Sequence, residues 1–142
     1  MRVFHVVAYE AYAATGQPVS SSPSLSELFG SVDRLYVGGY TSEVSGSSPT
    51  LEIVEQISLD NENWTSGNYL VGVPGIPIPL NVGSETKFQG ADADPDAWLF
   101  GAKAPFRRLR ITIGGTNANA MVRVWATGRD GSRGARSLAR PG

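Results

Sequence analysis

The chain has 142 residues, a formal net charge of −1 and no cysteine. This length suits one domain with one hydrophobic core, and the missing cysteine excludes disulfides, thiolate metal sites and a cysteine nucleophile. No apolar run approaches the ~20 residues of a membrane span, and the first residues do not resemble a signal peptide. We therefore expect a soluble protein that is made in the cytoplasm and does not bind a membrane.

The N-terminal half has the pattern of short strands separated by loops. The apolar spacing predicts a strand at 3–8, a loop at 15–24 and one helical turn at 24–30. Alternation then predicts strands at 32–40 and 50–59, which the loop SEVSGSSP joins. The inward face of the second strand is apolar with one exception, Glu55; its other members are Leu51, Ile53, Ile57 and Leu59.

The stretch SLDNENW, which follows this strand, raises the possibility of carboxylates beside a sugar-stacking ring. A turn at 60–63 explains it better, because Asp and Asn side chains bond their own backbone in turns. We expect Trp64 to start the returning strand and to pack over the edge of the sheet. The proline-rich segment 74–79 cannot be a central strand, because proline lacks a ladder donor.

The C-terminal half continues with strands and ends in a basic tail. Strands are predicted at 80–88, 97–103, 106–115 and 121–128. In the third of these, the residues Leu109, Ile111 and Ile113 face inward, whereas Arg108, Arg110 and Thr112 face outward.

Seven to eight strands with Gly, Pro and Asn turns predict an all-β chain. The expected architecture is an antiparallel β-sandwich, jelly-roll or immunoglobulin-like, with extended N- and C-terminal arms. The expected organisation is an N-terminal arm or edge strand at 1–15, a sandwich domain at 16–127 and a basic flexible tail at 128–142.

The charges are distributed unevenly. Residues 1–100 carry three basic and twelve acidic side chains, a net of −9, whereas residues 101–142 carry nine basic and one acidic, a net of +8. Either the two ends mix on one folded surface, or the basic end meets an acidic partner surface, such as a neighbouring copy. The predicted partner-contact residues are Arg107, Arg108, Arg110, Arg123, Arg129, Arg133, Arg136 and Arg140. The pI of about 5.8 favours protein over nucleic acid as the partner.

Residues that could support catalysis or bind a cofactor are sparse. A nucleophilic triad needs a base, and the single histidine, His5, lies in an apolar segment. No metalloprotease, nucleophile-elbow or phosphate-loop motif occurs in the chain. We therefore predict no catalytic residue, no metal site and no cofactor.

Two further groups of residues leave alternatives open. Asp92, Asp94 and Asp96 resemble the start of a calcium loop, but Ala97 and Lys103 replace its glycine and glutamate, so a solvated turn is favoured. The aromatic residues could form a sugar-stacking face, or they could be sandwich core and rim, which we favour. They are Trp64, Trp98, Trp125, Tyr36, Tyr40 and Tyr69.

Two stretches resemble small structural proteins of tailed bacteriophages: LYVGGYTSEVSGSSPTLEIVEQISLDNENW and FRRLRITIGGTNANAMVRVWA. In that family an "sG..PTL" loop leads into a long strand, a "D...W" turn follows, and an "R.R..I.GT" strand-turn-strand comes later. The resemblance covers roughly residues 35–126. The family includes capsid decoration (cement) proteins and other head or tail components. Several of these are β-sandwich or β-barrel modules that assemble as trimers on the capsid.

The resemblance implies a non-enzymatic virion structural protein on the capsid exterior. Its expected partners are the major capsid protein and copies of itself, with a homotrimer favoured, and no nucleic acid or membrane. The resemblance carries over no catalytic residue. The alternatives are a carbohydrate-binding β-sandwich module, a phage tail component and, third, a small jelly-roll enzyme.

Overall fold

The computed structural model describes residues 3–22, 34–91 and 105–129, and within these ranges the chain consists of strands and turns without a helix. One antiparallel sheet contains all of the described strands, so the predicted all-β class is confirmed. These are β1 (Val3–Ala14), β2 (Val19–Ser20), β3 (Arg34–Ser58), β4 (Thr65–Val71), β5 (Ile78–Pro79), β6 (Thr86–Ala91) and β7 (Phe106–Arg129). The described part of the chain thus holds no helix long and apolar enough to cross a membrane.

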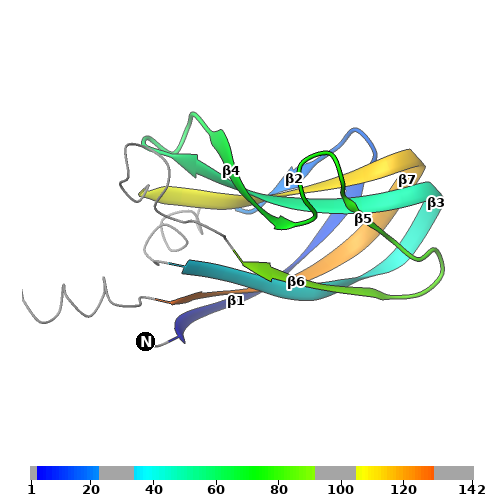
Figure 1. The fold of residues 1–142 in the computed structure, drawn as a ribbon, viewed down its shortest axis with the longest axis horizontal. Helices are drawn as coiled ribbons and strands as arrows, with labels where there is room; N and C mark the ends of the chain where they lie inside the picture. Colours follow the sequence, from blue (N-terminus) through cyan, green and yellow to red (C-terminus); the bar gives the residue numbers. More distant parts are fainter. Residues whose placement is uncertain (1–2, 23–33, 92–104, 130–142) are drawn as a thin grey trace, which may run out of the picture.

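The two long strands, β3 and β7, organise the fold. They pair antiparallel from Arg34 opposite Arg129 to Ser58 opposite Phe106. Both strands bend in the middle, so that each contributes to two layers (Figure 1). The lower layer in Figure 1 contains β1, β6, the first part of β3 and the second part of β7, and the upper layer contains β2, β4, β5 and the remaining parts. A single sheet therefore folds over to make a sandwich.

The bend of β3 lies where the sequence predicted the loop SEVSGSSP. The register of β3 against β7 shifts three times between Ser42 and Thr50. Gly46 has a φ of 105°, and a Cβ at this position would lie 2.4 Å from the Cα of Ala118. Only glycine suits both the left-handed backbone and this close approach. The polar segment is a bulged corner of a continuous ladder.

Several predicted strand boundaries are therefore wrong. The strands expected at 32–40 and 50–59 are one strand, and so are those expected at 106–115 and 121–128. β1 continues to Ala14 instead of ending at residue 8. The strand expected at 80–88 begins only at Thr86, because the preceding segment forms a turn. The helical turn expected at 24–30 and the strand expected at 97–103 lie outside the described residues.

The core lies between the two layers. The predicted inward residues Leu109, Ile111 and Ile113 are at most 1 % exposed, and they belong to one cluster with Val122 and Val124 of the lower layer. Alternation therefore identified the buried face of β7 correctly. In contrast, Leu59 was predicted to face inward and is 64 % exposed, because β3 ends one residue earlier, at Ser58.

Candidate functional site

The arginines predicted as partner contacts do not form one stripe. β7 bends between its two halves, so its outward residues lie on opposite outer faces of the sandwich. Arg108 and Arg110 lie on the outer face of the upper layer, and Arg123 lies on the outer face of the lower layer. The side chain of Arg129 and the residues Arg133, Arg136 and Arg140 lie outside the described part of the chain, as does Trp98.

Arg107 requires a correction, because it is completely buried. It has the same alternation as Leu109, so its side chain enters the core, where its Nη1 donates to Glu55 Oε2 at 3.0 Å. Glu55 is the one exception that the sequence showed on the inward face of β3, and it is also 0 % exposed. Asn68 donates to the other carboxylate oxygen of Glu55 at 3.2 Å. Both charged side chains therefore lie inside the sandwich, and Arg107 is not part of the exposed surface of the chain.

The outer face of the lower layer gathers the aromatic residues instead. The ladder places Tyr40 and Glu10 on either side of Arg123, and Gly38 opposite Trp125 in the next row. Tyr12 is 56 % exposed and Trp125 is 44 % exposed. We call this surface the aromatic–arginine face; it consists of Tyr12, Tyr40, Arg123 and Trp125.

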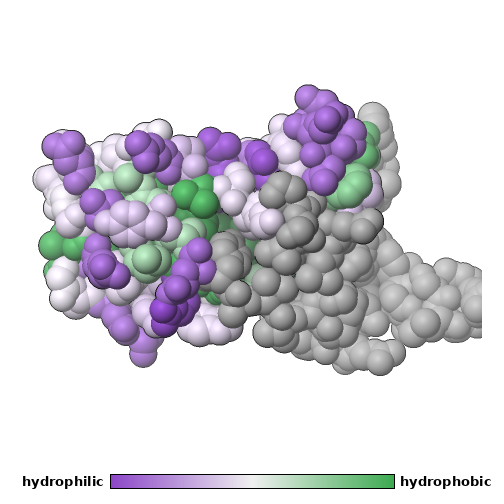
Figure 2. All heavy atoms as spheres, turned by 180° about the vertical axis from the view of Figure 1, so that it is seen from behind, coloured by the Kyte–Doolittle hydropathy of each residue, from purple (hydrophilic) through white to green (hydrophobic). Residues whose placement is uncertain are grey.

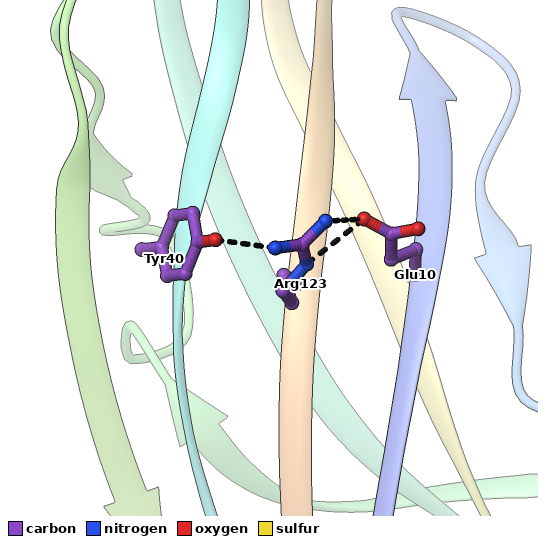
Figure 3. A network of polar contacts seen from close by, with 3 residues as sticks. All are labelled: Glu10, Tyr40 and Arg123. Carbon is purple, nitrogen blue, oxygen red and sulfur yellow. Dashed lines mark hydrogen bonds and ion pairs between the residues drawn. The ribbon is translucent and has the colours of Figure 1, made fainter.

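Arg123 is the centre of this face (Figure 3). Its Nε donates to Glu10 Oε2 at 2.8 Å, its Nη2 donates to the same oxygen, and its Nη1 donates to the Tyr40 hydroxyl at 2.6 Å. The bonds to Glu10 raise the pKa of the Arg123 guanidinium, with a smaller contribution from Tyr40. Three strands thus hold one cation in a fixed position, beside exposed rings.

The rings of Tyr40 and Trp125 lie side by side. Their centroids are 5.9 Å apart at an angle of 40°, and the Arg123 guanidinium lies 5.5 Å from the Tyr40 ring centre. Gly38 has no side chain beside Trp125, and the nearest atom to an added Cβ there would be 3.8 Å away. The backbone of β3 therefore has open space above it at this position. Such a platform of rings and a guanidinium can bind a flat apolar or aromatic group of a partner.

A second aromatic–arginine pair occupies the outer face of the upper layer. The Arg108 guanidinium lies 4.3 Å from the centre of the Trp64 ring, and its Nε donates to Gln56 Oε1 at 2.7 Å. Gln56 in turn donates to Ser66 at 3.3 Å. Desolvation lowers the pKa of Arg108, with a smaller effect from the nearby charge of Arg110. Trp64 precedes β4 and is half-buried, so this pair connects β3, β4 and β7.

The acidic turn beside Trp64 is a structural element. Asp60 Oδ1 accepts the backbone N–H groups of Glu62 and Asn63 at 2.9 and 2.8 Å, and Asn61 has a φ of 62°. These backbone bonds and the Asn63 and Ser58 side chains hold the pKa of Asp60 well below its ordinary value. The prediction of a turn at 60–63 is confirmed, because the carboxylate bonds its own backbone.

No group of three or more His, Asp or Glu side chains in the described ranges could hold a metal ion. Asp92, Asp94 and Asp96 lie outside those ranges, so the calcium-loop alternative stays a prediction. The sequence missed Glu10 and Tyr12 as site residues because it ended the first strand at residue 8. The alternation of Ala11 and Ala13 with Tyr12 was the available signal.

The fold and surfaces define an all-β sandwich with an exposed aromatic–arginine face. No family model matches the chain, and the search of the curated proteins found no match. Among solved structures, the chain is similar to the D431N mutant VP2 protein of infectious bursal disease virus, in derived T=1 particles, with 15 % identity and a TM-score of 0.44. The similarity covers 91 % of this chain and spans 33 % of that protein's length. At this TM-score the similarity does not establish a shared fold or function, and the fold class rests on the strands themselves.

Proposed function

We propose that the chain is a non-enzymatic structural protein of a virion, most specifically a head decoration protein that binds the major capsid protein on the capsid exterior as a homo-oligomer. The stretches that resemble tailed-phage structural proteins correspond to β3, the turn at 60–63 and β7. These elements make up most of the sandwich. A tail component is the closest variant of this proposal.

The observation that carries the proposal is the aromatic–arginine face. Protein interfaces are enriched in Trp, Tyr and Arg, and such residues contribute most of the binding energy. Here all three types lie together on one sheet face, and ion pairing to Glu10 holds Arg123 in place before any partner arrives. Such preorganisation reduces the entropy lost on binding.

The test is to isolate virions produced from the genome that encodes this chain and to locate the chain by mass spectrometry and electron microscopy. The proposal expects a stoichiometric component on the head exterior. Absence of the chain from purified particles would overturn it, and density confined to the tail would favour the tail variant.

A second experiment assigns the contact. Particles that lack the chain are incubated with purified wild-type protein or with Trp125→Ala, and bound protein is measured by sedimentation. We expect Trp125→Ala to lower the affinity at least about tenfold, as is usual for an aromatic side chain that becomes buried at the centre of an interface. Leu59→Ala is the matched control, because Leu59 is also an exposed apolar residue but lies outside the aromatic–arginine face. Equal loss for both variants would exclude this face as the contact.

Carbohydrate binding is the second candidate, and the neighbouring pocket favours it. A pocket of about 460 Å³ is lined by Tyr36, Gln89 and Gly90, and Tyr36 lies one row along the sheet from Gly38 and Trp125. Rings that stack on sugars and an amide that bonds hydroxyls would be combined there. A glycan array discriminates the two candidates: binding that Trp125→Ala abolishes supports this one, and no binding excludes it.

A further inference from the structure

The edge strand β1 carries an inference about how two copies of the chain meet. β1 is 12 residues long and pairs with β7 on one side, and no described strand pairs with its other side. Along an antiparallel strand, alternate N–H and C=O groups point away from the paired neighbour. A long strand with one such free edge is a template for another strand.

The short edge strands β5 and β6 carry features that hinder further pairing, and the described residues do not cover the free edge of β1. β5 has two residues and includes Pro79. β6 carries Lys87, and Gly90 of β6 approaches Leu70 of β4 so closely that an added Cβ would lie 1.6 Å from the Leu70 carbonyl oxygen. Proline, lysine, short length and covering are the usual means of preventing edge pairing. The β1 sequence VFHVVAYEAYAA contains neither proline nor lysine.

The side of the molecule on which β1 and β2 lie also presents some apolar residues. In the part of this side that Figure 2 draws in colour, a few apolar residues lie between polar residues above and below them. Val19 of β2 is only partly buried against the core. A strand added beside β1 would cover part of this surface.

Charge favours a second copy as the occupant. β1 has one acidic residue, Glu10, and its carboxylate is bound to Arg123 of the same chain. Two β1 edges can therefore approach without an uncompensated like charge between them. A partner rich in lysine or arginine would find no free carboxylate in the described part of this edge.

From these observations we infer that two copies associate through antiparallel pairing of their β1 strands across a two-fold axis. The pairing joins the lower layers into one continuous sheet, so that both aromatic–arginine faces lie on the same outer surface. This deepens the homo-oligomer part of the proposed function, but it specifies a dimer or an even multiple, whereas the sequence resemblance favoured a trimer.

The chain has no native cysteine, so single cysteines test the pairing on the full-length protein. One variant is made at each position from 6 to 11, and Gln17→Cys, an exposed residue beyond β1, is the control. In such a dimer, only the residue at the two-fold axis lies opposite the same residue of the second copy. Only at that position are the two Cα atoms within the separation that a disulfide needs. We expect one position to form covalent dimers at least about tenfold faster than the control under mild oxidation.

Light scattering of the unmodified protein gives an independent readout. The inference expects twice the 15.1 kDa chain mass, or an even multiple of it. A monomer at all concentrations, a trimer, or cross-linking along β1 no faster than at Gln17→Cys would overturn the inference. Virions that contain the chain despite such a result would leave the proposed function standing, so the two failures are distinguishable.

Discussion

The Arg107 guanidinium donates to the Glu55 carboxylate inside the sandwich at 3.0 Å, and neither side chain is exposed. The two residues are diagonal neighbours, because Glu55 lies opposite Leu109 and Arg107 lies opposite Ile57. Each is the charged exception on an otherwise apolar inward face. The two exceptions compensate each other across the β3–β7 ladder, and they lock its register in the upper layer.

Breaking this pair from either side should destabilise the protein strongly. Glu55→Gln or Arg107→Met leaves one buried charge unpaired, which costs about 3–5 kcal/mol of unfolding free energy. Replacing both, as Glu55→Leu with Arg107→Met, should be close to neutral, because no buried charge remains. Urea denaturation measures all three, and Glu52→Gln is the control, because Glu52 points to the opposite side of β3 and is only partly buried. Single effects that simply add in the double variant would contradict the pairing argument.

The sequence predicted the class of fold and the buried face of β7 because both depend on local alternation. Arg107 could have been assigned correctly by the same rule, since it is two residues before Leu109. The continuity of β3 and β7 could not be predicted, because a polar segment such as SEVSGSSP is compatible with either a free loop or a bulged corner. Only the pairing of residues far apart in the chain decides between them.

The aromatic–arginine face was only partly predictable for a related reason. Tyr40 and Trp125 were recognised as candidates for a binding face, but their neighbourhood depends on the β3–β7 register. The bend in β7 then separates Arg123 from Arg108 and Arg110, although all three face outward. A sequence pattern gives the side of a strand on which a residue lies, and not which layer that strand has joined.

Two adjacent glycines in β3 should differ strongly in how much stability is lost on substitution by alanine. A Cβ at Gly39 would lie 1.9 Å from the Arg123 carbonyl oxygen, whereas a Cβ at Gly38 would meet nothing closer than 3.8 Å. Gly39→Ala must therefore displace β3 from β7 and should cost about 3 kcal/mol or more. Gly38→Ala should change stability by less than about 1 kcal/mol, because a strand glycine already carries an entropic cost. Thermal unfolding measures both, and equal stabilities would show that β3 and β7 approach less closely.

Acid should weaken the turn that follows β3. The folded state lowers the pKa of Asp60 below its ordinary value of 3.8, so ionised Asp60 stabilises the fold above that pH. This contribution is lost as the pH falls below 3.8 towards the lower folded pKa. The midpoint of thermal unfolding should therefore fall less steeply with acid in Asp60→Asn than in the wild type. Identical slopes for wild type and Asp60→Asn would remove the assigned role.

The two described tryptophans should separate stability from binding. Trp64 stacks on Arg108 at 4.3 Å and is half-buried, so Trp64→Ala should lower the unfolding free energy by about 1–2 kcal/mol, and Trp64→Phe by less. Trp125 is exposed, so Trp125→Ala should leave the urea midpoint nearly unchanged while it weakens partner binding. Urea denaturation measures the stability of each variant, and a particle-binding assay on the same preparation measures its affinity for the partner. If Trp64→Ala lost binding at unchanged stability, the outer face of the upper layer would be the contact surface instead.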